Sequence, residues 1–303
     1  MNKLFALLAF FSLLATSFVT ARGAEPKREP PPQVAALKSA GVNVSRLKEG
    51  GWNVEVKSVK DLNDDVWRQI ESLPEVTRFS AGQGFTDADL ARLCKVKSIR
   101  TIFFNGPAIT DAGLAALNDL PELERFGVDH SSVITGAGLP ALKDAKKLTA
   151  LGFGGCIIND GGVADLVQLM QLKELKLGHV RITRKSFPLL AGLPNLERLE
   201  ITPNWDPHYY TAADFAALAP ASKLGELEVH DMVLPWDDGL EHLKALKSLK
   251  TLDLYWCYVT DADMAKLKAA LPNVKIDVRN PAGPDRLKQY NEALEKLQKE
   301  AKK

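Results

Sequence analysis

The stretch ITDAGLAALNDLPELERFGV, residues 109–128, joins two hydrophobic periods in one short segment. Its first half carries apolar residues at helical spacing, namely Leu114, Leu117 and Leu120. Its second half carries apolar residues that alternate as the buried residues of a strand do, namely Leu123, Phe126 and Val128. These residues therefore predict a helix that is followed directly by a strand.

The second half of this stretch is one copy of an L-x-x-L-x-L pattern that recurs every 23 to 28 residues. Eight copies are present, and they begin at Val76, Ile99, Leu123, Leu148, Leu172, Leu196, Leu224 and Leu249. We number the positions of each copy from this first apolar residue. Since strand side chains alternate, positions 1, 4 and 6 are expected to face the core, whereas positions 3, 5, 7 and 8 are expected to face solvent.

Polar residues that favour helix starts follow most copies at a similar offset. They are Thr86-Asp87, Thr110-Asp111, Thr135, Asn159-Asp160, Thr183, Thr211 and Thr260-Asp261. Their side-chain oxygens can accept the unpaired N–H groups of the first helical turn, and Asp also favours the positive end of the helix dipole. The copy at Pro235-Trp236 departs from the pattern, and we expect Asp237 to cap the helix there. One strand and one helix bury too little apolar surface alone, so the copies must stack into a continuous core.

This period and pattern are those of leucine-rich repeats, and the chain resembles that family over about residues 50–280. The phrase T-D-A-G-L-x-x-L, here Thr110–Leu117, is similar to the cysteine-containing or F-box-type subclass and to secreted bacterial proteins built from such repeats. The resemblance implies an α/β solenoid, with a curved parallel sheet on the concave face and helices on the convex face. It also implies binding to a protein partner. A ubiquitin-ligase adaptor role is not expected, because residues 34–75 contain no convincing F-box.

The N-terminal residues indicate export. Residues 1–21 resemble a secretory signal, with Lys3 ahead of the apolar run Leu4–Phe18 and small residues suited to cleavage around Ala21. An uncleaved N-terminal anchor is the alternative. Residues 22–33 form a proline-rich linker. We therefore expect a secreted, periplasmic or cell-envelope protein that has no membrane span after cleavage of the signal.

The two ends of the repeat array need caps, because an end repeat exposes its leucines on one side. Residues 34–75 are expected to supply one cap, with a hairpin at Gly50-Gly51, a strand over 52–56 and a degenerate helix over 63–73. The repeats then occupy residues 76–278. Residues 279–303 form a charged C-terminal helix or tail, which is either a capping or solvated helix or a helix that binds a partner.

The charge balance gives no general attraction to nucleic acid. The 303-residue chain has a formal net charge of +1, and removal of residues 1–21 would leave 38 basic residues against 38 acidic ones. A chain near neutrality is not drawn to phosphate backbones or to anionic lipid as a whole. We therefore expect no nucleic-acid partner.

The concave positions divide into two zones. The middle zone is glycine-rich, with Gly127, Gly152, Gly154, Gly155 and Gly178, and it is flanked by Asp129, His130 and His179. The C-terminal zone is acidic and aromatic, and it contains Glu200, Glu228, His230, Asp231, Asp253, Tyr255 and Trp256. The carboxylates of its position-5 column repel one another, which a basic partner, a cation, Lys176, Lys250 or solvent could offset. Both zones are candidate partner-binding surfaces.

The longest interval between copies contains an aromatic loop, residues 202–215. It carries Trp205, His208, Tyr209 and Tyr210. Tyr and Trp are enriched at interface hot spots, so we expect Trp205, Tyr209 and Tyr210 to contact a partner. The alternative is that these rings fold back and fill a gap in the array.

No catalytic motif is recognisable, and we expect no enzyme, cofactor or metal centre. The concave histidines lie two repeats apart, about 10 Å at the usual strand spacing, which is too far for a shared metal. Cys94, Cys156 and Cys257 are odd in number and widely spaced, so they are interpreted as small buried residues. The sequence thus predicts a non-enzymatic module that binds a macromolecule, with protein as the expected partner. A structural spacer and, less favoured, a carbohydrate-binding protein are the alternatives.

Overall fold

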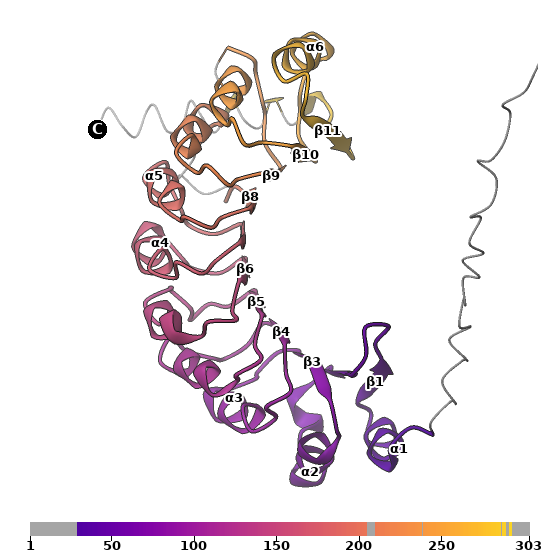
Figure 1. The fold of residues 1–303 in the computed structure, drawn as a ribbon. Coiled ribbons are helices and arrows are strands. Elements are labelled where there is room, and N and C mark those ends of the chain that lie inside the picture. The colour runs from indigo at the N-terminus through magenta and orange to yellow at the C-terminus, as the bar shows by residue number, and fades with distance from the viewer. Residues whose placement is uncertain (1–28, 205–209, 238, 286, 289–290, 293–303) are drawn as a thin grey trace, which may run out of the picture.

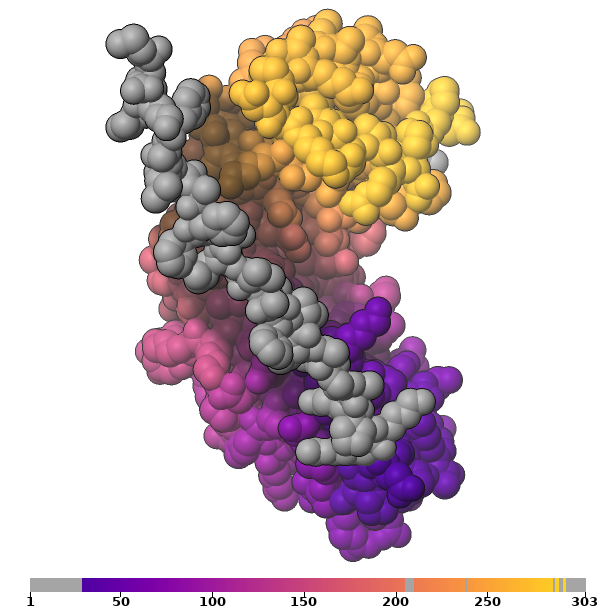
Figure 2. Space-filling view, turned by 45° about the vertical axis from the view of Figure 1, so that its right-hand side comes forward, coloured from indigo at the N-terminus to yellow at the C-terminus, as the bar shows by residue number. Residues whose placement is uncertain are grey.

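The chain forms one curved solenoid in which a parallel sheet lines the inner side and short helices line the outer side (Figure 1). A computed structural model describes residues 29–204, 210–237, 239–285, 287–288 and 291–292. The 11-stranded sheet follows chain order from β1 to β11, so no strand is inserted between sequence neighbours. The space-filling view shows the same order, because the colours succeed one another from one end of the body to the other (Figure 2). The fold class predicted from the repeat is confirmed.

The elements have the following bounds. The strands are β1 Asn43–Arg46, β2 Trp52–Val56, β3 Val76–Ala81, β4 Thr101–Asn105, β5 Arg125–Asp129, β6 Ala150–Gly154, β7 Glu174–Gly178, β8 Arg198–Thr202, β9 Glu226–His230, β10 Thr251–Tyr255 and β11 Lys275–Arg279. The α-helices are α1 Pro32–Ser39, α2 Asp64–Ser72, α3 Asp87–Leu93, α4 Asp160–Leu166, α5 Ser186–Ala191 and α6 Asp261–Ala270. The 3-10 helices are η1 Val59–Asp61, η2 Gly113–Asp119, η3 Leu139–Asp144, η4 Ala212–Leu218 and η5 Leu240–Ala245. Within this described part of the chain, no helix is long and apolar enough to cross a membrane.

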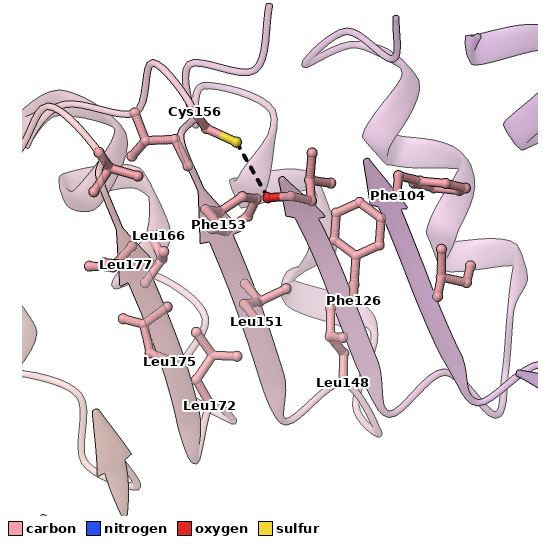
Figure 3. Close-up of a cluster of buried hydrophobic side chains, with 14 of the residues drawn as sticks. Phe104, Phe126, Leu148, Leu151, Phe153, Cys156, Leu166, Leu172, Leu175 and Leu177 are labelled. Carbon is pink, nitrogen blue, oxygen red and sulfur yellow. Dashed lines mark hydrogen bonds between the residues drawn. The ribbon is translucent and has the colours of Figure 1, made fainter. Parts of the chain in front are cut away.

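The core is a continuous stack of the predicted inward positions. In the copy that contains β6, Leu148, Leu151 and Phe153 are all buried, and Figure 3 shows them pointing from the sheet toward the helices. Leu151 is in register with Phe126 on one neighbouring strand and with Leu175 on the other. Each buried side chain of this size contributes ~1.5–3 kcal/mol relative to exposure. Every repeat therefore depends on both of its neighbours for burial.

Aspartates of the Thr-Asp phrases join successive repeats. The Asp87 carboxylate accepts hydrogen bonds from the backbone N–H of Thr110 (2.8 Å) and from its hydroxyl (2.7 Å). Asp160 accepts the same two bonds from Thr183, at 2.8 and 2.6 Å. Thr86, Asn159 and Thr260 meanwhile cap helices α3, α4 and α6 through their side-chain oxygens, as predicted. Sequence reasoning predicted these three caps but missed the bonds between repeats.

Four predicted caps are wrong. Helices η2, η3 and α5 begin after Ala112, Gly138 and Lys185, which make no side-chain cap hydrogen bond, so Thr110, Thr135 and Thr183 are not their N-caps. Helix η5 follows Gly239, which makes no side-chain cap hydrogen bond, and Asp237 is exposed. Asp237 lies two residues before this N-cap, outside the position from which a side chain reaches the N–H groups of the first turn.

The N-terminal end of the sheet is covered. Strand β1 pairs antiparallel with β2, and helix α1 buries Val34 and Leu37 beside them. Helix α1 was not predicted, and its first residues had been assigned to the linker. Pro32 fits the first helical turn, because an N–H is unpaired there in any helix. The expected signal, residues 1–21, lies outside the described residues.

The C-terminal end is less covered. Strand β11 extends one residue beyond the predicted limit of the repeats, and Val278 on it is 41% exposed. Residues 284–285, 287–288 and 291–292 are helical, and the rest of the expected tail helix lies outside the described residues.

Candidate functional site: the concave face

A left-handed bend ends most strands on the concave face. At position 8, φ is +56° for His130, +50° for His179, +55° for Asp231 and +55° for Trp256. Gly106 and Gly155 occupy the same position with φ of +65° and +60°. Left-handed backbone costs roughly 1–2 kcal/mol for a residue with a Cβ, and glycine avoids that cost. Large side chains are therefore held at these sites in spite of the backbone conformation.

The glycines of the middle zone suggested a stretch of uncovered backbone, but side chains of neighbouring residues cover part of it. A Cβ added to Gly154 would lie 2.2 Å from Asp129 Oδ1, and one added to Gly155 would lie 3.1 Å from His130 Cδ2. Phe103, which is 40% exposed, covers Gly127 in the same way. Gly127, Gly154 and Gly155 thus each accommodate a side chain from the preceding repeat. Phe103 was missed as a site candidate, although a Phe at concave position 5 was a usable signal.

A cavity of about 200 Å³ joins the two zones that the sequence treated separately. Its floor includes Gly154, Gly155 and Gly178. Its other lining residues are Asp129, His130, Lys176, His179, Glu200, Thr202 and His230. Three concave histidines therefore surround one hollow.

The predicted acidic column exists and is neutralised in part by two cations. Glu200, Glu228 and Asp253 occupy registered positions on β8, β9 and β10. Lys176 Nζ lies 3.0 Å from Glu200 Oε1. Arg279 Nη2 lies 3.4 Å from Glu228 Oε1 and 3.3 Å from Asp253 Oδ2. Lys176 was predicted as a compensating charge.

The second predicted cation, Lys250, does not take part, and Arg279 takes part without having been predicted. Lys250 forms no ion pair with the described residues of the column, and Arg279 was not anticipated because it lies on the last strand. Burial raises the pKa of Asp253, and the carboxylates of Glu228 and Asp277 raise it further, while Arg279 opposes them. The pKa of Lys176 is also raised, because the hydrogen bond and charge of Glu200 outweigh an opposing and individually larger effect of burial.

His230 is the centre of a group that could hold a metal ion. Its Nε2 lies 2.8 Å from Glu228 Oε1 and 3.9 Å from Glu200 Oε1. One ligand atom of each of these three residues falls within 4.8 Å of the others. Imidazole and carboxylate ligands suit Zn²⁺. However, Glu200 already forms an ion pair with Lys176, and Glu228 forms one with Arg279. The expectation of no metal stays a prediction.

The aromatic part of the C-terminal zone continues from His230 to the exposed surface. The His230 and Tyr255 rings lie 5.0 Å apart, and the Tyr255 and Trp256 rings lie 6.0 Å apart in a T-shaped pair. The Arg279 guanidinium lies 5.6 Å from the Tyr255 ring centroid. Trp256 remains 46% exposed, which is unusual for so large an apolar side chain.

The aromatic loop supports the alternative interpretation at Tyr210. Tyr210 is 1% exposed and packs on Phe187 and Phe215, with centroid distances of 4.9 and 6.4 Å. Its hydroxyl has no hydrogen-bond partner among the described residues, and burial raises its pKa. The predicted partner contact of Tyr210 is therefore wrong, because the ring fills the core. Trp205 and Tyr209 lie outside the described residues.

The cysteines are structural. All three are buried, and among the described residues they form no disulfide. Cys156 Sγ donates to Val128 O at 3.4 Å (Figure 3), and Cys257 Sγ donates to Val229 O at 3.3 Å. These two bonds join the same positions of different repeats. Burial raises the pKa of the Cys94 thiol to about 12 and that of Cys156 to about 11, so neither is a thiolate at neutral pH.

Comparison with known proteins supports the fold through structure rather than sequence. No family model and no curated protein matches the chain. Among solved structures, the complex of TLR13 with ssRNA13 is similar with a TM-score of 0.52 and 15% identity, over 74% of this chain and 32% of that one. Two internalins of Listeria monocytogenes are also similar. InlF has a TM-score of 0.48 and 20% identity, over 71% of this chain and 57% of its own. InlC2 has a TM-score of 0.46 and 22% identity, over 70% of this chain and 83% of its own.

The chain thus spans about a third of TLR13 and little more than half of InlF. The registered strands, the stacked core and the similarity to TLR13 together establish an α/β solenoid of leucine-rich repeats.

Proposed function

We propose that the chain is a non-enzymatic binding module that holds a protein partner on its concave face. The observation that carries this proposal is Trp256, which is 46% exposed on left-handed backbone beside a network of charged residues. Strained conformations cluster at functional sites, and exposed tryptophans are common binding hot spots. The proposed surface extends from Trp256 and Tyr255 through the acidic column to the cavity.

Protein is favoured over nucleic acid on charge. TLR13 is seen in a complex with single-stranded RNA, so this kind of fold does not by itself exclude RNA. In this chain, the concave residues Glu200, Glu228 and Asp253 outnumber their cations Lys176 and Arg279. A phosphate backbone would meet net negative charge there, which opposes binding.

The setting of this function is also part of the proposal. A signal over residues 1–21 would place the module outside the cell or in the envelope. The T-D-A-G-L-x-x-L phrases and the Cys at position 9 of two repeats support the cysteine-containing subclass. Both inferences stand on the sequence.

The test compares Trp256→Gly with the wild-type chain in cross-linking capture from the native envelope. Glycine is suited to left-handed backbone, so this variant removes the ring without adding strain. Loss of a hot-spot tryptophan weakens binding by ~2 kcal/mol or more, so capture of the major cross-linked partner should fall roughly 30-fold. Met170→Ala, at a residue that is 52% exposed away from the concave positions, is the control. Equal capture by wild type and Trp256→Gly would contradict the proposal.

A spacer that associates through its ends is the second candidate. It is favoured by β11, which has no further strand beside it in the described part of the chain, and by the exposed Val278. Sedimentation of wild type and Val278→Lys separates the two candidates. An oligomer that the lysine dissociates would support the spacer, whereas a monomer in both would support the binding module.

A further inference from the structure

The cavity between the two concave zones has the chemistry of a side-chain pocket. Resting on the proposed function, we propose that this cavity receives an arginine side chain of the protein partner. Its volume is about 200 Å³, and it opens onto the concave face between β5 and β9. Among its glycines, Gly178 leaves room for a flat group to lie against the backbone, because a Cβ added there would meet no atom nearer than 3.7 Å.

Two histidines present hydrogen-bond acceptors at this cavity. His179 Nδ1 lies 3.1 Å from the carbonyl oxygen of Pro203, which can only accept, so Nδ1 carries the proton. His130 Nδ1 lies 3.0 Å from Asn105 Oδ1 and is assigned in the same way. In the neutral form of each ring, Nε2 is therefore an acceptor. Neither Nε2 has a hydrogen-bond donor among the described residues.

Asp129 adds an acceptor that carries a full charge. Its carboxylate lines the cavity and, within the described part of the chain, receives no hydrogen bond and forms no ion pair within 4 Å, although its charge contributes to raising the pKa of Lys176. Lys176 is the one permanently charged cation among the described lining residues, and Glu200 holds its ammonium at 3.0 Å. Acceptors thus outnumber available donors, which favours a donor-rich, positively charged ligand.

Arginine fits this arrangement better than lysine. Its guanidinium is planar, presents five donors in a fixed fork and meets a carboxylate through two parallel bonds. Asp129 can supply that carboxylate, while His130 and His179 can accept from the remaining N–H groups. The ammonium of lysine would make one point contact and would leave acceptors unsatisfied.

The charges around the imidazoles set the direction of the pH dependence. The groups that face them are Asp129 on β5, Lys176 on β7, Glu200 on β8, His230 and Glu228 on β9, and Asp231 after β9, which lies 3.8 Å from His179 Nε2. Protonation of either imidazole would convert Nε2 from an acceptor to a donor and add positive charge. Arginine binding should therefore weaken on acidification, whereas binding of an anion would strengthen.

The experiment titrates the full chain with N-acetyl-arginine amide and follows the imidazole signals of His130 and His179 by NMR. We expect saturable shifts at pH 7.5 and at least a fivefold loss of affinity at pH 5.5. The citrulline analogue, which has the same shape without the charge, should shift the imidazole signals of neither His130 nor His179. The lysine analogue should bind more weakly than the arginine probe.

Variants locate the binding. Asp129→Asn should lower the affinity for the arginine probe at least tenfold, whereas Asp144→Asn, at an exposed residue outside the cavity, should leave it unchanged. Circular dichroism reports whether Asp129→Asn folds. If it does not, His130→Asn, which suits left-handed backbone and removes the ring, replaces it and should also weaken binding.

Equal binding of arginine and citrulline, or tighter binding at pH 5.5, would overturn the proposal. Inorganic phosphate that binds more tightly at pH 5.5 would identify an anion site instead. These outcomes are distinct from failure of the proposed function. If the arginine probe does not bind but capture still depends on Trp256, the pocket is wrong and the binding module stands.

Discussion

Arg279 lies between Glu228 and Asp253, within 3.4 and 3.3 Å of one oxygen of each. The last strand of the sheet therefore supplies the cation that reduces repulsion in the acidic column. The same guanidinium lies 5.6 Å from the Tyr255 ring, so it also orders the aromatic end of the proposed surface.

Arg279→Gln should therefore destabilise the C-terminal repeats. Exposed ion pairs contribute ~0.2–1 kcal/mol each, so the loss of two pairs should lower the free energy of unfolding by about 1 kcal/mol. Urea unfolding at low salt measures this change, and added salt should diminish it. Lys247→Gln, at an exposed residue outside the column, is the control. An Arg279→Gln effect that is independent of salt would contradict the electrostatic explanation.

Asp160 should make the chain sensitive to acid. Burial alone would raise the pKa of Asp160, but hydrogen bonds from Ser186 and Thr183 together hold it below its usual value. A carboxylate with a lowered folded-state pKa stabilises the fold above its unfolded-state pKa of about 3.9, and this stabilisation is lost as the pH falls through the folded-state value.

Asp160→Asn should thus lower the free energy of unfolding at pH 7 by roughly 1–3 kcal/mol. The difference between the variant and wild type should shrink between about pH 4 and pH 2. Equilibrium unfolding across this range measures the difference. Asp165→Asn, at a partly buried position of α4 whose carboxylate accepts a 3.5 Å bond from Gln168, provides a matched comparison. A difference that stays constant with pH would show that the bonds of Asp160 do not depend on its charge.

Tyr210→Phe should be tolerated or slightly stabilising. The Tyr210 hydroxyl is buried without a hydrogen-bond partner among the described residues, so its removal relieves an unsatisfied polar group. Tyr210→Ala should instead cost roughly 3–5 kcal/mol, because it leaves a cavity between Phe187 and Phe215. Thermal unfolding measures both changes. Weaker partner capture by Tyr210→Phe at unchanged stability would restore the interface role that the sequence suggested.

The thiols should be inert in the folded chain. With the pKa of Cys156 raised to about 11 and that of Cys94 to about 12, almost no thiolate exists at pH 8. Alkylation by iodoacetamide, followed by mass spectrometry, should modify these residues only after urea unfolding. Rapid labelling of Cys156 without urea would indicate that its repeat opens or that its bond to Val128 is absent.

Repeat periodicity was sufficient to predict the fold but not every contact that stabilises it. Leu148, Leu151 and Phe153 were placed correctly because their burial depends only on strand alternation and stacking. The bond from Asp87 to Thr110 could not be predicted in the same way, because it depends on the offset between neighbouring repeats. Helix α1 was missed because its short apolar face, Val34 and Leu37, follows prolines that favour a linker.

The site was predictable at the level of positions and not of contacts. Alternation assigned Asp129, His130 and Glu200 to the concave side. It could not show that Asp129 lies across Gly154, since that depends on side-chain rotamers. Tyr210 illustrates the reverse difficulty: an aromatic residue in an inserted loop has the composition of an interface, and only its surroundings show that it belongs to the core.

The two ends of the sheet are unequal, since β1 and α1 cover one end whereas Val278 is exposed at the other. Local unfolding should therefore begin at the C-terminal end. In a linear array, each unit is protected only by its immediate neighbours, so fraying starts where that protection is thinnest. Amide hydrogen exchange should accordingly be fastest near β11 and slow progressively toward β2. Trp256 and the acidic column lie in the half that opens first. A ligand bound there would stabilise the folded C-terminal repeats and so delay denaturation of the whole array.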